Sequence, residues 1–168
     1  VGITAAVCIV VARLGGTRCG RGVRWLVAAT LAAAHATESL VAWWQGWYAR
    51  DMLPLQLCDV AAMLAVWGLL TRDRRAIEPL YFFALSGTLP ALLTPELDVT
   101  FPQLRFVVYF VEHGLTVAAP LLLVAGLGLH PRPGSWRRAV VLVNALAAVA
   151  MLANLALGTN FLYLSRKP

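Results

Sequence analysis

Charged side chains are scarce in this sequence. Only 13% of its 168 residues are charged, whereas a soluble domain carries roughly 25%. Hydrophobic residues make up 60% of the chain, and the mean hydropathy is +0.74. This composition excludes an ordinary water-soluble domain, because too few polar groups remain to cover its surface. The sequence therefore predicts an all-α, multi-pass bundle of transmembrane helices, each of about 20 residues.

Cysteine frameworks and metal-binding patterns are also missing. Cys8, Cys19 and Cys58 are too few and too scattered to build a disulfide framework or a zinc site. The sequence has no Gly-rich phosphate loop, no H-E-x-x-H and no C-x-x-C. Neither Ser39 nor Ser86 lies in a G-x-S-x-G turn. We therefore expect no metal and no cofactor.

Six apolar runs organise the chain. They cover residues 1–12, 25–47, 53–70, 76–93, 104–129 and 139–158. The first run is too short to cross a membrane, and no closing helix follows the last. We therefore expect a single integral membrane domain over residues 1–168, with six of seven helices visible, the first truncated and the last missing. Pro54 is predicted to lie in the first turn of the third helix, while Pro90 and Pro120 are predicted to kink the fourth and fifth.

The basic residues are grouped in alternate loops between these runs. Four arginines lie in residues 13–24, three in 72–75 and three in 132–138, which accounts for ten of the 14 basic residues. The positive-inside rule predicts that these three loops are cytoplasmic. An aromatic belt at the opposite interface would then consist of Trp43, Trp44, Trp47 and Tyr48.

The net charge also bears on partners and source. A charge of +6 would favour nucleic-acid binding in a soluble protein. Here the clustering of the charge indicates membrane topology instead, so no nucleic-acid partner is expected. Every basic residue except Lys167 is arginine, which favours a GC-rich bacterium. The expected location is therefore a bacterial plasma membrane.

Ionisable side chains inside apolar runs are costly and usually functional. Here they are His35, Glu38, Asp59, Glu112 and His113. Counted at about 1.5 Å per residue, Cys58 and Asn154 lie about 6 Å from the outer ends of their helices. His113 and Glu38 lie about 12 Å and 13 Å deep by the same count. All of these depths fall in the outer half of the membrane, so we predict a shared polar cavity there.

Helical spacing places several of these side chains on common faces. The longest stripe, at i, i+4, i+7 and i+8, consists of Arg105, Tyr109, Glu112 and His113. His35 and Glu38, at i and i+3, share a face of another helix. The stripe predicts the wall of a polar funnel that opens to the outer leaflet.

Cys58 and His113 together suggest an activated thiol. A cysteine and a histidine brought into contact form a thiolate–imidazolium pair, and Glu38 or Asp59 would orient the imidazole. The substrate would be a lipid ester or thioester reached from the bilayer, so membrane lipid is expected as both substrate and solvent. The guanidinium of Arg105 would hold a phosphate or carboxylate headgroup. Supporting roles in the cavity are expected for Tyr109, Glu112 and Asn154.

Two other classes of protein fit the same residues. A buried cysteine is usually a small hydrophobe, and His35, Asn144 and Asn154 would serve as hydrogen-bonding contacts between helices. Those roles describe a structural membrane protein. Polar clusters in helix bundles also mark ion or proton paths. A small-solute or proton-coupled transporter would depend on Glu38 and Asp59.

Four segments of the chain occur in an order found in a known family. They are LPLQLCD at 53–59, RAIEPLYFFALSGTLPALLTPEL at 75–97, FPQLRFVVYFVEHGL at 101–115 and NLALGTNFLYLSRKP at 154–168. The set resembles the YwaF-like integral membrane proteins of bacteria, which usually have about seven helices. Two positions depart from the family pattern. Gln56 stands where histidine is common, and Glu112 stands where a small residue is common.

The resemblance carries an expected chemistry. The YwaF-like family is similar to a eukaryotic multi-pass family of lipid acyltransferases, in which a cysteine and a histidine form the active pair. It is more distantly similar to the androgen-induced membrane hydrolases, which use a threonine and a histidine. The resemblance implies thioester chemistry on an acyl lipid, by transfer or hydrolysis, with Cys58 and His113 as the pair.

Overall fold

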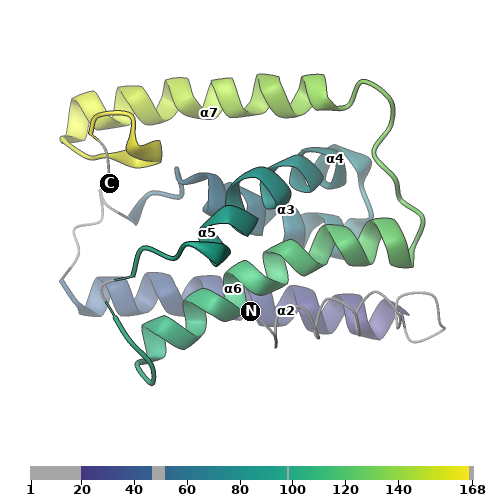
Figure 1. Ribbon diagram of the computed structural model, residues 1–168, viewed down its shortest axis with the longest axis horizontal. Coiled ribbons are helices and arrows are strands. Elements are labelled where there is room, and N and C mark those ends of the chain that lie inside the picture. Colours follow the sequence, from purple (N-terminus) through teal and green to yellow (C-terminus); the bar gives the residue numbers. More distant parts are fainter. Residues whose placement is uncertain (1–19, 47–51, 98, 167–168) are drawn as a thin grey trace.

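The computed structural model describes residues 20–46, 52–97 and 99–166, and over these ranges it contains helices and no strand (Figure 1). The elements in chain order are α2 (Gly20–Trp44), α3 (Leu57–Thr71), α4 (Arg74–Phe83), η2 (Ala84–Thr88), α5 (Leu89–Leu93), α6 (Leu104–Leu121), η3 (Leu122–Gly126), α7 (Trp136–Leu157) and η4 (Phe161–Tyr163). The predicted first run, which contains Cys8, lies outside the described residues, as do Cys19, Trp47 and Tyr48. The all-α class predicted from the composition is confirmed.

Four helical segments in the described part of the chain are long and apolar enough to cross a membrane. They are Gly20–Trp44, Arg74–Leu93, Leu104–Gly126 and Trp136–Leu157. The apolar helix α3 has 15 residues and so extends about 22 Å, which is less than the roughly 30 Å hydrocarbon core. With α3, the described residues hold five apolar helices, so the predicted count of six visible helices is not matched there.

Helix α3 occupies the centre of the bundle. It packs against α2, α4 and α6, while α7 lies on the opposite side of the bundle from α2 and packs against α4 (Figure 1). The most deeply buried aliphatic side chains, including Leu31, Leu69, Leu80 and Leu122, fill the space between these helices. Much of α7 remains apolar and exposed, with Leu155 77% accessible. An apolar helix with so little protein cover suits contact with lipid.

The start of α3 differs from the sequence prediction. Pro54 does not lie in its first turn, because the helix begins at Leu57. Gln56 is the N-cap, and its backbone N–H donates to Asp59 Oδ2 at 3.1 Å, as in a capping box. The side chain of Asp59 therefore stabilises the end of α3. The same correction moves Cys58 from about 6 Å inside the helix to its second residue.

The predicted proline kinks coincide with π-helical turns. Pro90 follows η2 and lies in the first turn of α5, and Pro120 lies in α6 just before η3. Proline has no N–H for the helical ladder, and wider π turns are a common way to adjust the ladder near such an interruption. The η2 turn brings Gly87 so close to α3 that an added Cβ would lie 2.7 Å from Leu57 Cδ2.

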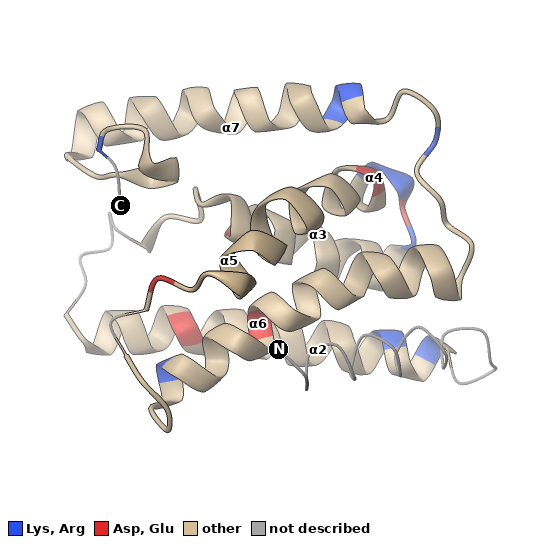
Figure 2. Ribbon diagram, in the orientation of Figure 1, with Lys and Arg blue, Asp and Glu red and all other residues tan. Residues whose placement is uncertain are grey.

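The described arginines of the three basic clusters lie at one end of the bundle, where α2 and α7 begin and α3 ends (Figure 2). Arg24 is buried there and donates from Nη1 to the carbonyl oxygen of Leu69 at 2.7 Å. Glu78, also buried, accepts from Arg132 Nε at 2.6 Å and from Arg138 Nη1 at 3.2 Å. The hydrogen bond to Glu78 raises the pKa of the Arg132 guanidinium. These contacts join segments that are distant in sequence.

Candidate functional site

A polar cavity of about 600 Å³ lies at the other end of the bundle, between α2, α3, α5 and α6. Its lining includes all five ionisable side chains noted inside the apolar runs, His35, Glu38, Asp59, Glu112 and His113, together with Cys58, Arg105 and Tyr109. Asn154 is not among the lining residues. The described structure therefore brings side chains from three separate apolar runs to one concave site, although they are up to 78 residues apart in sequence.

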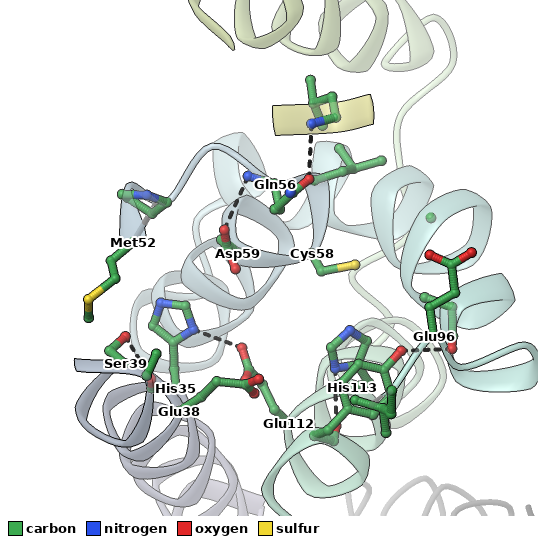
Figure 3. Close-up of a pocket in the computed structure, with 18 of the residues that line it drawn as sticks. His35, Glu38, Ser39, Met52, Gln56, Cys58, Asp59, Glu96, Glu112 and His113 are labelled. Carbon is green, nitrogen blue, oxygen red and sulfur yellow. Dashed lines mark hydrogen bonds and ion pairs between the residues drawn. The ribbon is translucent and has the colours of Figure 1, made fainter. Parts of the chain in front are cut away.

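Cys58 and His113 enter the cavity from different helices. Cys58 points inward from the first turn of α3, and the His113 ring faces the same space from α6 (Figure 3). The Thr88 hydroxyl, which is buried in η2, lies beside the thiol. Cys58 is the second residue of α3, and Asp59 follows it in the same turn.

Two contacts hold the imidazole of His113, and both come from Tyr109. Nδ1 lies 3.0 Å from the Tyr109 carbonyl oxygen, and the two rings stack with centroids 3.9 Å apart and planes at 26°. A carbonyl only accepts, so Nδ1 carries the proton and donates it. In the neutral ring Nε2 is then the proton acceptor. The Tyr109 hydroxyl donates to the Ala91 carbonyl at 2.8 Å, which fixes this ring against α5.

The acidic side chains of the cavity have other partners. His35 Nδ1 lies 2.7 Å from Glu112 Oε1, and Arg105 Nε lies 3.8 Å from Glu38 Oε1. Glu112 and His113 leave α6 in different directions, as their one-residue spacing requires, so Glu112 approaches α2 (Figure 3). The predicted orientation of His113 by Glu38 or Asp59 stays a prediction. The observed polar contact of its Nδ1 is the Tyr109 carbonyl.

No metal centre is evident in the described part of the chain. Among the described residues, no group of three or more His, Cys, Asp or Glu side chains is arranged to hold a metal ion. The described lining of the cavity offers a thiol, imidazoles, carboxyl groups and a guanidinium.

Asn154 acts at a distance from the cavity, through the segment that follows α7. Its Oδ1 accepts from the Phe161 N–H at 2.7 Å and from Thr159 Oγ1 at 2.9 Å, and its Nδ2 donates to the Phe161 carbonyl at 3.0 Å. These bonds fold residues 158–163 back toward α3. Leu162 and Tyr163 then line the cavity.

Gln56 and Glu96 hold the same segment from the opposite side. The Leu162 N–H donates to Gln56 Oε1 at 3.0 Å, and the Tyr163 hydroxyl donates to Glu96 Oε2 at 3.3 Å. Burial raises the pKa of the Tyr163 phenol. Leu162 and Tyr163 have φ angles of 54° and 52°, a left-handed conformation that side-chain-bearing residues adopt at a cost. The sequence offered one signal for this contact, the Gln56 departure from the family pattern.

Replacing Asn154 with leucine should release this segment. We expect amide hydrogen exchange at Phe161 to quicken by about tenfold or more, because a buried side chain that makes three hydrogen bonds to residues 159–161 would be lost. Asn144→Leu is the matched control, since Asn144 lies on the same helix and bonds only to the Val140 carbonyl one turn earlier. Equal exchange at Phe161 in the two variants would contradict the assigned role of Asn154.

The fold and the cavity define a helical multi-pass membrane protein with a buried polar site. A family model described as the TMEM164 family matches residues 1–168. The chain therefore belongs to the TMEM164 family. No curated protein and no solved structure matches it. The finer resemblance to YwaF-like bacterial proteins stays a prediction.

Proposed function

We propose that this protein transfers or hydrolyses acyl groups of membrane lipids, with Cys58 as nucleophile and His113 as general base. The observation that carries the proposal is the common cavity lined by both side chains, together with the Nδ1 contact that leaves His113 Nε2 as a proton acceptor. Membrane-spanning helices surround the cavity, so an ester substrate would arrive from the bilayer.

The proposed reaction has two steps. In the first, His113 Nε2 accepts the Cys58 thiol proton, the sulfur attacks the acyl carbonyl, and the departing alkoxide takes the proton from His113. An acyl thioester on Cys58 and a lipid alcohol result. In the second, His113 deprotonates water or an acceptor alcohol, and the resulting oxygen nucleophile attacks the thioester. The C–S bond breaks, and His113 returns the proton to the departing Cys58 sulfur. Hydrolysis and transfer differ only in this acceptor.

The remaining polar groups would bind and orient the lipid. Arg105 lines the cavity beside Glu38, where its guanidinium would bind a phosphate or carboxylate headgroup. We infer that the arginine-rich end faces the cytoplasm by the positive-inside rule, and that the cavity lies in the outer half of the membrane. A bacterial plasma membrane remains the proposed location.

Acylation of Cys58 tests the proposal directly. The whole chain, purified in detergent, is treated with a p-nitrophenyl ester of a medium-chain fatty acid, and the peptide that contains Cys58 is examined by mass spectrometry. We expect a hydroxylamine-sensitive acyl adduct on Cys58. Cys58→Ser should lose it, and the Cys8→Ser/Cys19→Ser double variant should keep it. Unchanged acylation and lipid turnover in Cys58→Ser would refute thiol catalysis.

A second candidate is proton-coupled transport of a small solute, favoured by the ion pair of His35 with Glu112 and the nearby Glu38. Such groups hold protons in membrane transporters. Transport would be lost in Glu38→Gln and would be insensitive to thiol blockage. Uptake into proteoliposomes before and after treatment with a maleimide separates this candidate from the enzyme.

A further inference from the structure

An apolar groove lies between α2 and α3, directly beside the polar cavity. It measures about 340 Å³, and His35 lines both spaces. The groove side of α2 carries Ala32 and Ala36, one helical turn apart, and that of α3 carries Met63 and Trp67 at the same spacing. Leu31, Ala62 and Val66 complete the apolar lining, and His35 is its polar member.

The groove leads away from the cavity along the helix axes. Helix α2 runs from the arginine-rich end toward the cavity, and α3 runs back (Figure 1). His35 marks the cavity end, and Ala32 and Trp67 lie farther from it. Met63 and Trp67 are each 44% exposed, so the groove is open at the surface of the bundle. In a bilayer this surface borders hydrocarbon, because α2 is a candidate membrane span.

We propose that this groove binds one acyl chain of the membrane lipid whose ester occupies the polar cavity. A lipid placed with its carbonyl at Cys58 has its headgroup in the cavity, and its chain must leave toward an apolar space. The groove is such a space and begins at a residue of the cavity wall, His35. At roughly 30 Å³ per methylene, a volume similar to that of water, it would hold on the order of ten methylenes.

The groove selects among chains by shape. An acyl chain that moves from lipid into the groove gains little from the hydrophobic effect, since its surroundings are apolar before and after. Close packing against Ala32 and Ala36 therefore decides which chain fits. The proposal rests on the proposed function for the position of the ester, but chain binding itself does not require the thiol.

Photo-cross-linking tests the occupant. The whole chain carrying Cys58→Ser is placed in liposomes of phosphatidylcholine that include a phosphatidylcholine with a diazirine in mid-chain. Irradiation is followed by peptide mapping. We expect adducts on the α2 and α3 peptides that line the groove, and loss of these adducts in Ala36→Phe and Ala32→Phe, because a phenyl ring fills the groove. Ala33→Phe is the matched control, since Ala33 is exposed on α2 and does not line the groove; it should keep them.

Adducts on the exposed face of α7, at Leu152 and Leu155, report ordinary surrounding lipid and serve as the internal standard. Groove adducts that persist in both phenylalanine variants, in constant ratio to those on α7, would mean surrounding lipid only and would overturn the proposal. Absence of groove adducts in the Cys58→Ser protein without a phenylalanine substitution would also overturn the proposal, because the groove would then hold no acyl chain. Because the thiol is absent, failure here leaves acylation of Cys58 intact, and failure of that acylation leaves this result intact.

Discussion

Replacing His113 with alanine is expected to slow acylation of Cys58 by about 10²- to 10⁴-fold, the usual contribution of a general base. Nδ1 of His113 is engaged by the Tyr109 carbonyl, which directs the basic Nε2 into the cavity that Cys58 also lines. Without the imidazole, the cavity no longer places this base beside the thiol, and the thiol proton must pass to a less effective acceptor. Release of p-nitrophenolate in the first turnover measures the rate.

Two further variants make this result specific. His130→Ala removes a histidine that lies at the arginine-rich end of the bundle, opposite the cavity. This variant should leave the acylation rate unchanged. His113→Gln keeps a polar side chain but no base, and should be as slow as His113→Ala. A rate within about threefold of the parent in both His113 variants would remove the general-base role, whatever the reactivity of Cys58.

The second large effect concerns stability, at the ion pair of His35 with Glu112. Glu112 is 4% exposed and lies 2.7 Å from the His35 ring. Glu112→Leu alone should destabilise the fold, because it leaves a polar ring without its partner among apolar helices. His35→Phe alone should also destabilise it, since a buried carboxyl group then loses its hydrogen bond. The double variant should recover most of the loss, as apolar replacements of buried pairs often do.

A double-mutant cycle measures this coupling. Free energies of unfolding in mixed micelles for the parent, the two single variants and the double variant should give a coupling energy of about 1–2 kcal/mol. The Trp136→Leu variant, at an exposed position of α7, controls for general effects of surface substitution. Additive effects of the two substitutions would show that the contact between His35 and Glu112 contributes no stability to the fold.

The helices were predictable because membrane spans have a strong local signature. The run predicted at 104–129 corresponds to α6 and η3 at Leu104–Gly126, and the run at 139–158 corresponds to α7 at Trp136–Leu157. Long uninterrupted apolar stretches permit only helix in a bilayer, where each backbone polar group must be satisfied internally. The start of α3 was missed because a cap made by Gln56 and Asp59 begins the helix at Leu57, three residues after Pro54.

The cavity itself was only partly predictable. The helical spacing of Arg105, Tyr109, Glu112 and His113 placed them on one side of α6, and all four line the cavity. Sequence patterns could not pair these residues with those of other helices. Asn154 was expected in the cavity, and it instead holds the segment that contributes Leu162 and Tyr163 to the cavity wall. Contacts between distant segments leave no periodic trace in the sequence.

The sequence by itself determined that this chain spans a membrane, where its helices lie and which polar side chains would be costly to bury, because these properties depend on composition and local spacing. The tertiary structure decided which polar groups meet. It directed His113 by the Tyr109 carbonyl, paired Glu112 with His35, and set an apolar groove beside the cavity. The physical reason is that packing between helices depends on the shapes of the side chains on both sides of every contact. No single segment of the chain contains that information.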